Sequence, residues 1–174
     1  NGRVIPAGPL RARLGDQLLF ADAVLTMGEG GGADALVRQA ARAGKPIYQA
    51  KARPLEPERF AGRRFLAFAG IGHPEKFFDT VTAAGGTVVR SRSFPDHHFY
   101  AGDELAELAA AAHAEGLALL TTAKDAARLR HEAPAGFAEG LEVLEIEATF
   151  DPPQAPRRLI EQALDAWRQR RLAG

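Results

Sequence analysis

Apolar residues recur with two different spacings between residues 63 and 150, and the two spacings alternate along the chain. Short runs with the apolar content or period-two pattern of β-strands cover residues 64–71, 87–93, 117–122 and 141–146. Stretches with helical spacing cover residues 74–84, 103–115 and 124–130, and each lies between two strands. This β-α-β-α-β-α-β order predicts an α/β fold with a mainly parallel sheet, right-handed crossovers and helices on both faces.

The first part of the chain shows a similar pattern after an irregular start. Residues 6–11 form a proline- and glycine-punctuated stretch that predicts a shaped surface loop. An apolar run at 21–27 and a second run at 45–52 predict two strands. Residues 33–43 between them predict a helix, and Gly44 stands where a left-handed C-terminal cap is expected.

Proline and charge density mark a connector at residues 53–58. We therefore predict a first lobe at 1–50, a linker or hinge at 51–62, a smaller α/β lobe at 63–150 and a C-terminal amphipathic helix within 151–174. The helix, at 155–172, has apolar residues on one side and arginines largely on the other. Its arginine-rich side either contacts acidic headgroups or is a solvated face, and the acidic residues among the arginines favour the solvated face.

Composition limits the class of protein. The 174 residues are 46% hydrophobic, which is enough for a buried core. Lys plus Arg and Asp plus Glu both total 22, so no electrostatic footprint for nucleic acid is present.

The chain has no cysteine, no apolar run long enough to cross a bilayer and no signal-peptide pattern, which together favour the cytoplasm. It begins at Asn1 without an initiator methionine, and we expect a partial polypeptide.

The densest group of titratable side chains is the segment Phe94-Pro95-Asp96-His97-His98. Histidine exchanges protons near neutral pH, and a neighbouring carboxylate can hold it in one tautomer, so the segment is a candidate proton-transfer site. In a second interpretation, Asp96 caps the following helix and both histidines are solvated. A metal site built from Asp96, His97 and His98 is a third interpretation, and a less favoured one, because adjacent residues rarely point to one centre.

Two further segments follow predicted strands. Gly70 and Gly72 precede a helix whose first residue is Pro74, and backbone amides there can receive an anion, although glycine also serves turn geometry alone. At Thr121-Thr122-Ala123-Lys124-Asp125, capping by Thr122 with solvated Lys124 and Asp125 is the favoured interpretation. No G-x-x-x-x-G-K-[ST] loop occurs in the 174 residues.

Four blocks, taken in order, resemble the C-terminal half of the tetraacyldisaccharide 4'-kinase family, the lipid A 4'-kinases of Gram-negative bacteria. The blocks are residues 3–11, residues 68–74 with Phe77-Phe78, residues 94–98 and residues 119–126. The resemblance implies transfer of the ATP γ-phosphoryl group to the 4'-hydroxyl of a tetraacyldisaccharide 1-phosphate. It also implies Mg²⁺ as cofactor and the cytoplasmic face of the inner membrane as location.

The resemblance assigns roles to particular residues. His97 would accept or orient the proton of the acceptor hydroxyl, paired with an aspartate of the nucleotide-binding lobe, and Asp96 would orient His97. Arg11 would bind phosphate oxygens. Ala12 and Ala123 stand where many family members have acidic residues, so no role of those carboxylates is carried over.

The resemblance also implies that residues 1–50 end a P-loop nucleotide-binding lobe. The phosphate-binding loop, the Mg²⁺ ligands, the partner aspartate and a membrane-associating N-terminal helix would then lie upstream of Asn1. We expect the chain alone to be inactive. The alternatives are a metal-dependent phosphoesterase using Asp96, His97 and His98, and a non-catalytic domain that binds a phosphoglycolipid through Arg11 and the Gly70 turn.

Overall fold

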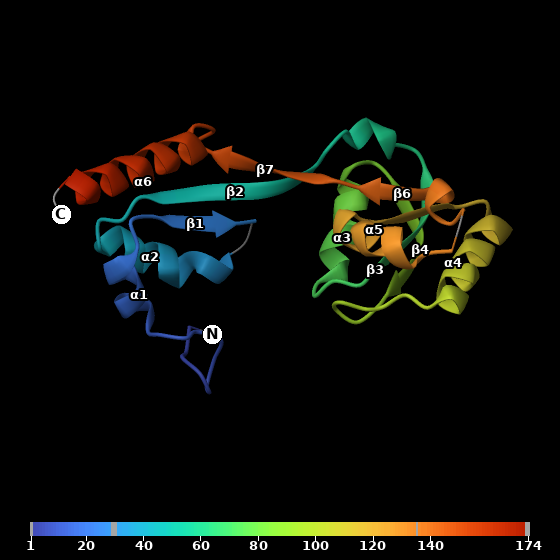
Figure 1. The fold of residues 1–174 in the computed structure, drawn as a ribbon, viewed down its shortest axis with the longest axis horizontal. Coiled ribbons are helices and arrows are strands. Elements are labelled where there is room, and N and C mark those ends of the chain that lie inside the picture. The colour runs from blue at the N-terminus through green and yellow to red at the C-terminus, as the bar shows by residue number, and fades with distance from the viewer. Residues whose placement is uncertain (1, 29–30, 135, 173–174) are drawn as a thin grey trace. The chain divides into compact units, whose positions relative to one another are not determined.

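The structure is a computed structural model that describes residues 2–28, 31–134 and 136–172. Its contacts divide the chain into two compact units (Figure 1). One unit combines residues 1–52 with residues 148–174, and the other is the continuous stretch 53–147. The second unit is therefore inserted into the sequence of the first.

The first unit contains a three-stranded sheet in the order β1-β2-β7, in which β1 runs parallel to β2. The strands are β1 (Val24–Met27), β2 (Ile47–Pro54) and β7 (Ile146–Asp151). The helices are α1 (Leu14–Phe20), η1 (Gly31–Ala33), α2 (Asp34–Arg42) and α6 (Ala155–Leu172). Leu18, Val24 and Ala40 form a small buried core that joins α1, β1 and α2.

The second unit contains a four-stranded, fully parallel sheet in the order β4-β3-β5-β6. The strands are β3 (Arg64–Ala69), β4 (Thr87–Ser93), β5 (Ala118–Thr122) and β6 (Leu141–Leu144). The helices are η2 (Pro57–Arg59), α3 (Pro74–Ala83), α4 (Gly102–Glu115), α5 (Ala123–Glu132) and η3 (Ala138–Gly140). The predicted parallel sheet is confirmed.

The central strand β3 has a core on each of its two faces, because successive side chains of a strand point to opposite sides. Phe65 packs in one cluster with Val81 of α3. Phe68 packs in the other cluster with Leu105 of α4 and Leu129 of α5. Helices therefore cover both faces of this sheet, as the alternating pattern predicts.

Two elements differ from the sequence-based prediction. The stretch 141–146, predicted as one strand, contains all of β6 and the first residue of β7, separated by Glu145. Strand β6 pairs with β5, whereas β7 joins the sheet of the first unit, and the apolar alternation carries no signal for this change of partner. Helix α1 is the second difference, since no helix is predicted at 14–20.

The unit boundaries also differ from the predicted linker. They fall inside two strands, between residues 52 and 53 in β2 and between 147 and 148 in β7. The segment 53–62 belongs to the second unit, and its Phe60 is 1% exposed with its ring centroid 6.1 Å from that of Phe65. The C-terminal helix groups with the first unit. Among the described residues, none of the helices has the length and apolar character needed to cross a membrane.

Candidate functional site

The candidate site lies at the carboxyl edge of the parallel sheet in the second unit. Strands β3, β4 and β5 end at Ala69, Ser93 and Thr122, and their carboxyl ends meet at one edge because the strands are parallel. The loop that starts at Gly70 and the loop 94–101 both begin there, as predicted from the sequence. Ligands of open parallel sheets bind at this edge.

Gly70 is the hub at which the two loops and α5 are joined. Its amide donates to Asp125 Oδ2 over 3.1 Å. Its carbonyl accepts from the His97 amide over 3.2 Å and from Arg128 Nη1 over 3.1 Å. A Cβ at position 70 would lie 2.9 Å from the Tyr100 hydroxyl, so only glycine fits. The Gly70 amide already donates to Asp125, so the predicted anion site now depends on the amide of Gly72. A Cβ at position 72 would meet only Asp96 Oδ2, at 3.8 Å.

Asp125, which accepts the hydrogen bond from the Gly70 amide, is fully buried. Its Oδ2 accepts a hydrogen bond from Thr122 Oγ1 over 2.8 Å, and its Oδ1 accepts one from Arg128 Nη1 over 3.0 Å. Thr122 caps α5 by accepting from the Asp125 amide over 3.1 Å, which confirms the predicted cap. The prediction that Asp125 is solvated was wrong, because its carboxylate is needed by three donors in the interior.

His97 is the exposed member of the site. Its φ of 63° lies in the left-handed region, which non-glycine residues seldom adopt, and its side chain is 70% exposed. Arg128 Nη2 lies 3.2 Å from Nδ1, and Asp96 Oδ2 lies 3.8 Å from Nε2. The Arg128 contact from α5 and the uncommon backbone angle of residue 97 together orient the exposed ring.

Asp96 carries a negative charge beside this ring. Partial desolvation opposes its ionisation, but the neighbouring His97 and the ammonium of Lys124 leave the pKa of Asp96 below its ordinary value. Lys124 Nζ lies 3.5 Å from Asp96 Oδ1. The sequence interpretation of Lys124 as a solvated side chain therefore omitted its contact with the site.

His98 has a separate, structural environment. Its Nε2 lies 2.8 Å from Glu104 Oε2 in α4, and its ring stacks on Phe94 with a centroid distance of 4.7 Å. The hydrogen bonds from His98 and from the Ala101 amide hold the pKa of Glu104 below its ordinary value. The two adjacent histidines thus have different environments. His98 contacts Glu104 of α4, whereas the His97 side chain is exposed to solvent.

Tyr100 packs close to Gly70. Its hydroxyl is buried and has no hydrogen-bond partner within the part of the chain that the structure describes. Burial, and then the neighbouring Asp125 carboxylate, raise the pKa of Tyr100. The phenol is neutral and fills space in the aromatic cluster with Phe68 and Phe94.

The arrangement does not favour the metal-site interpretation. Asp96, His97 and His98 do not converge, because His98 faces Glu104 while a guanidinium occupies Nδ1 of His97. Residues 2–28, 31–134 and 136–172 contain no group of three or more His, Cys, Asp or Glu side chains placed to hold a metal ion.

Arg11 lies in the other unit. Its loop is closed by backbone hydrogen bonds, from the Ile5 amide to the Leu10 carbonyl over 2.9 Å and from the Leu10 amide to the Arg3 carbonyl over 3.1 Å. Arg11 follows this closed loop and is exposed. The structure thus brings together His97, Asp96, Gly70 and Gly72 in one unit and holds Arg11 in the other.

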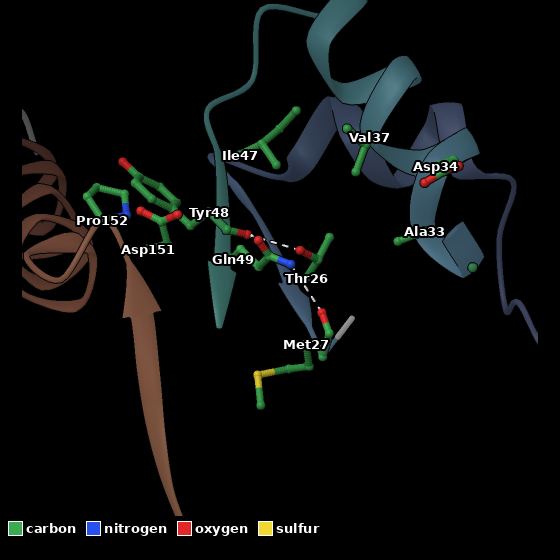
Figure 2. Close-up of a pocket in the computed structure, with 12 residues that line it drawn as sticks. Thr26, Met27, Ala33, Asp34, Val37, Ile47, Tyr48, Gln49, Asp151 and Pro152 are labelled. Carbon is green, nitrogen blue, oxygen red and sulfur yellow. Dashed lines mark hydrogen bonds between the residues drawn. The ribbon is translucent and has the colours of Figure 1, made fainter. Parts of the chain in front are cut away.

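The first unit also has an open pocket of about 730 Å³ that was not predicted from the sequence (Figure 2). It lies at the carboxyl end of β1, where Thr26 Oγ1 donates to the Tyr48 carbonyl over 3.4 Å and Gln49 Nε2 to the Gly28 carbonyl over 3.2 Å. Asp34 and Asp151 contribute the acidic groups of its lining.

Comparisons with known proteins point to one family. The model of the LpxK family, tetraacyldisaccharide-1-P 4'-kinase, matches residues 1–165. The chain is 67% identical over 172 residues to a tetraacyldisaccharide 4'-kinase of Mesorhizobium japonicum, covering 99% of this chain and 50% of the relative. A Chelativorans relative of the same name is 49% identical over 174 residues, covering 99% and 51%, and one from Brucella anthropi is 48% identical over 172 residues, covering 98% and 50%.

A solved structure with a similar fold is that of LpxK from Aquifex aeolicus, described as an apo form in complex with ATP. The TM-score is 0.55 at 22% sequence identity, covering 92% of this chain and 48% of that chain. This likeness supports the fold alone. The chain spans about half the length of the relatives that it matches.

Proposed function

The chain belongs to the tetraacyldisaccharide-1-phosphate 4'-kinase family, and on that premise we propose that it forms about half of a lipid kinase. The complete enzyme would transfer the γ-phosphoryl group of ATP to the 4'-hydroxyl of a tetraacyldisaccharide 1-phosphate. The names of the similar proteins and the ATP complex of the Aquifex aeolicus structure support this proposal.

The observation that carries the proposal is the exposed His97 ring, fixed beside Asp96 at the carboxyl edge of the sheet. Phosphoryl transfer depends mainly on positioning and on neutralising charge, and the acceptor hydroxyl needs a group that accepts or orients its proton. A histidine with a neighbouring carboxylate suits that task. His97 would act on the hydroxyl, and Asp96 would orient His97.

Phosphate binding would use two other features. Gly72 precedes the ten-residue helix α3, whose first amides and dipole favour an anion, and a Cβ there would meet only Asp96 Oδ2. The exposed guanidinium of Arg11 offers a planar pair of donors that fits phosphate oxygens. We assign Gly70 the hub role, which keeps the Gly72 turn in place.

We assign ATP and Mg²⁺ mainly to the part of the relatives that this chain does not span. The 174 residues contain no Walker A loop, and the described part of the chain offers no metal-ligating cluster, so no Mg²⁺ ligand is assigned here. We also propose peripheral association with the cytoplasmic face of the inner membrane, through a segment outside this chain. The chain alone is expected to give no ATP-dependent lipid phosphorylation.

The test uses the complete kinase and measures transfer of labelled γ-phosphate from ATP to the tetraacyldisaccharide 1-phosphate. The substitution His97→Ala is expected to lower kcat by about 10² to 10⁴, the usual contribution of a group that handles a proton. His113→Ala removes an exposed histidine of α4 and is the matched control, expected to be unchanged. Unchanged turnover with weaker lipid binding in His97→Ala would support the non-catalytic binding alternative.

A separate measurement addresses the phosphoesterase alternative. A stoichiometric transition metal in the purified chain, together with hydrolysis of phosphate esters, would favour that activity over the kinase. The guanidinium at His97 Nδ1 opposes binding of a second cation there, and we expect neither result.

A further inference from the structure

Arg128 connects helix α5 to His97, and the sequence pattern did not single it out. Its Nη2 lies 3.2 Å from His97 Nδ1, while its Nη1 donates to Asp125 Oδ1 over 3.0 Å and to the Gly70 carbonyl over 3.1 Å. The three acceptors come from α5, the Gly70 loop and the His97 loop. One planar guanidinium therefore fixes the spacing of all three segments.

The position of Arg128 is itself held by buried groups. Its side chain is 20% exposed and its partner Asp125 is 0% exposed. Asp125 is in turn fixed by the Thr122 hydroxyl and the Gly70 amide. Moving the guanidinium away would leave a buried carboxylate without its cationic partner, which costs much free energy. The guanidinium therefore stays in place beside the ring.

The contact with Arg128 determines where the His97 proton sits. Arginine remains charged in proteins and can only donate hydrogen bonds, so the nitrogen that it contacts must offer a lone pair. Nδ1 of His97 is then unprotonated, and the neutral ring carries its proton on Nε2. The imidazolium would point an N–H at a guanidinium, which repels it.

We propose that Arg128 is a positioning residue that holds His97 as the neutral tautomer with its proton on Nε2. Resting on the proposed function, His97 then meets the reacting groups through a hydrogen-bond donor and orients the acceptor hydroxyl instead of removing its proton. The proton-accepting role that the sequence left open for His97 is thereby excluded in this arrangement.

The other charged groups around the ring agree with this tautomer. Asp96 Oδ2, 3.8 Å from Nε2, is an acceptor on the side where the proton is placed. Lys124 contacts the opposite oxygen of Asp96, at 3.5 Å, and leaves Oδ2 facing the ring. The neighbouring His98 is engaged with Glu104. At Nδ1 a donor faces an acceptor, whereas Asp96 lies too far from Nε2 for a hydrogen bond, so the Nε2–H group remains available to a substrate.

The test is nuclear magnetic resonance of the 174-residue chain labelled with ¹⁵N-histidine. At a pH where the imidazole is neutral, long-range ¹H–¹⁵N correlations assign each ring nitrogen as protonated or unprotonated. We expect an unprotonated Nδ1 and a protonated Nε2 for His97. A proton on Nδ1, or an even mixture of tautomers, would overturn the proposal, and this measurement requires no variant.

Variants then identify the cause. Arg128→Met removes the donor and is expected to raise the population of the Nδ1–H tautomer several-fold, as read from the two ¹⁵N shifts. Arg130→Met changes an exposed arginine two residues further along α5 and is the matched control, with unchanged shifts expected. Arg128→Lys keeps a donor and should retain part of the bias. Identical His97 shifts in Arg128→Met and wild type would overturn the role of Arg128.

The proposal about the tautomer and the proposed function can be disproved independently of each other. In the complete kinase, Arg128→Met is expected to lower kcat about tenfold or more with little change in the KM for lipid, since orientation is lost in the transition state. If His97→Ala retains full turnover while the tautomer is as expected, the proposed function of His97 fails and the Arg128 network stands. A loss in KM alone for Arg128→Met would contradict a positioning role.

Discussion

Gly70 shows how one residue without a side chain determines the geometry of the site. Its amide and its carbonyl are both used, by Asp125 on one side and by Arg128 and His97 on the other. The glycine was recognised in the sequence as a turn residue with access to an anion. Its actual role depends on three segments that are distant in sequence, and no local pattern reveals such a contact.

The substitution Gly70→Ala tests this crowding. The added methyl group would lie 2.9 Å from the Tyr100 hydroxyl and 3.3 Å from Asp125 Oδ1, so buried groups must shift. We expect the free energy of unfolding to fall by about 1–3 kcal/mol, measured by urea denaturation. Gly72→Ala is the control, because its methyl group meets only Asp96 at 3.8 Å, and equal losses in the two variants would contradict the crowding.

The same reasoning explains which site residues could be predicted from the sequence. His97 and Asp96 stood out because they cluster within one short segment that follows a strand. Asp125 was assigned to the surface and Arg128 was not singled out, since a carboxylate and an arginine three residues apart are ordinary on any helix surface. Their importance comes from burial at the sheet edge, which depends on the packing of β3, β4 and α5.

At the scale of elements, strands and helices with strong periodicity were predicted closely. The ranges 87–93 and 155–172 agree with β4 and α6 at both ends. Helix α1 was missed because its seven residues are too few for a clear helical period and only Leu18 is buried. The division between β6 and β7 was missed because a strand shows its pairing partner only in the folded protein.

The cap of α5 provides a prediction for a single element. Thr122 both accepts from the Asp125 amide and donates to the Asp125 carboxylate. Thr122→Ala is expected to lower the free energy of unfolding by about 0.5–2 kcal/mol, because the helix loses its cap and a buried carboxylate loses a donor.

The comparison for this variant is Thr82→Ala in α3, whose hydroxyl donates only to the Phe78 carbonyl within its own helix. Thermal and urea unfolding followed by circular dichroism measure both variants. If Thr82→Ala is as damaging as Thr122→Ala, loss of the cap is not the cause.

At the scale of the whole molecule, the second unit has the features of an independent domain. Residues 53–147 contain a four-stranded sheet with a buried cluster on each face, and both clusters lie entirely within this stretch. A continuous segment with its own core is expected to fold alone.

Expression of residues 53–147 by themselves tests this expectation. We expect a dispersed amide spectrum and a single cooperative urea transition, with the contacts of His97 and Arg128 retained. Residues 1–52 alone are the comparison, and we expect them to be unfolded, since β7 and α6 of the first unit are absent from that piece. A disordered 53–147 segment would contradict the division of the chain into these two units.

The insertion of one unit within the other also has a consequence during synthesis. Residues 53–147 are synthesised before residues 148–174, the second segment of the outer unit. All the strands of the inner unit are thus made before β7, which pairs with β2 in the outer unit, is complete. Within these 174 residues, the inserted unit is therefore complete in sequence before the unit that surrounds it.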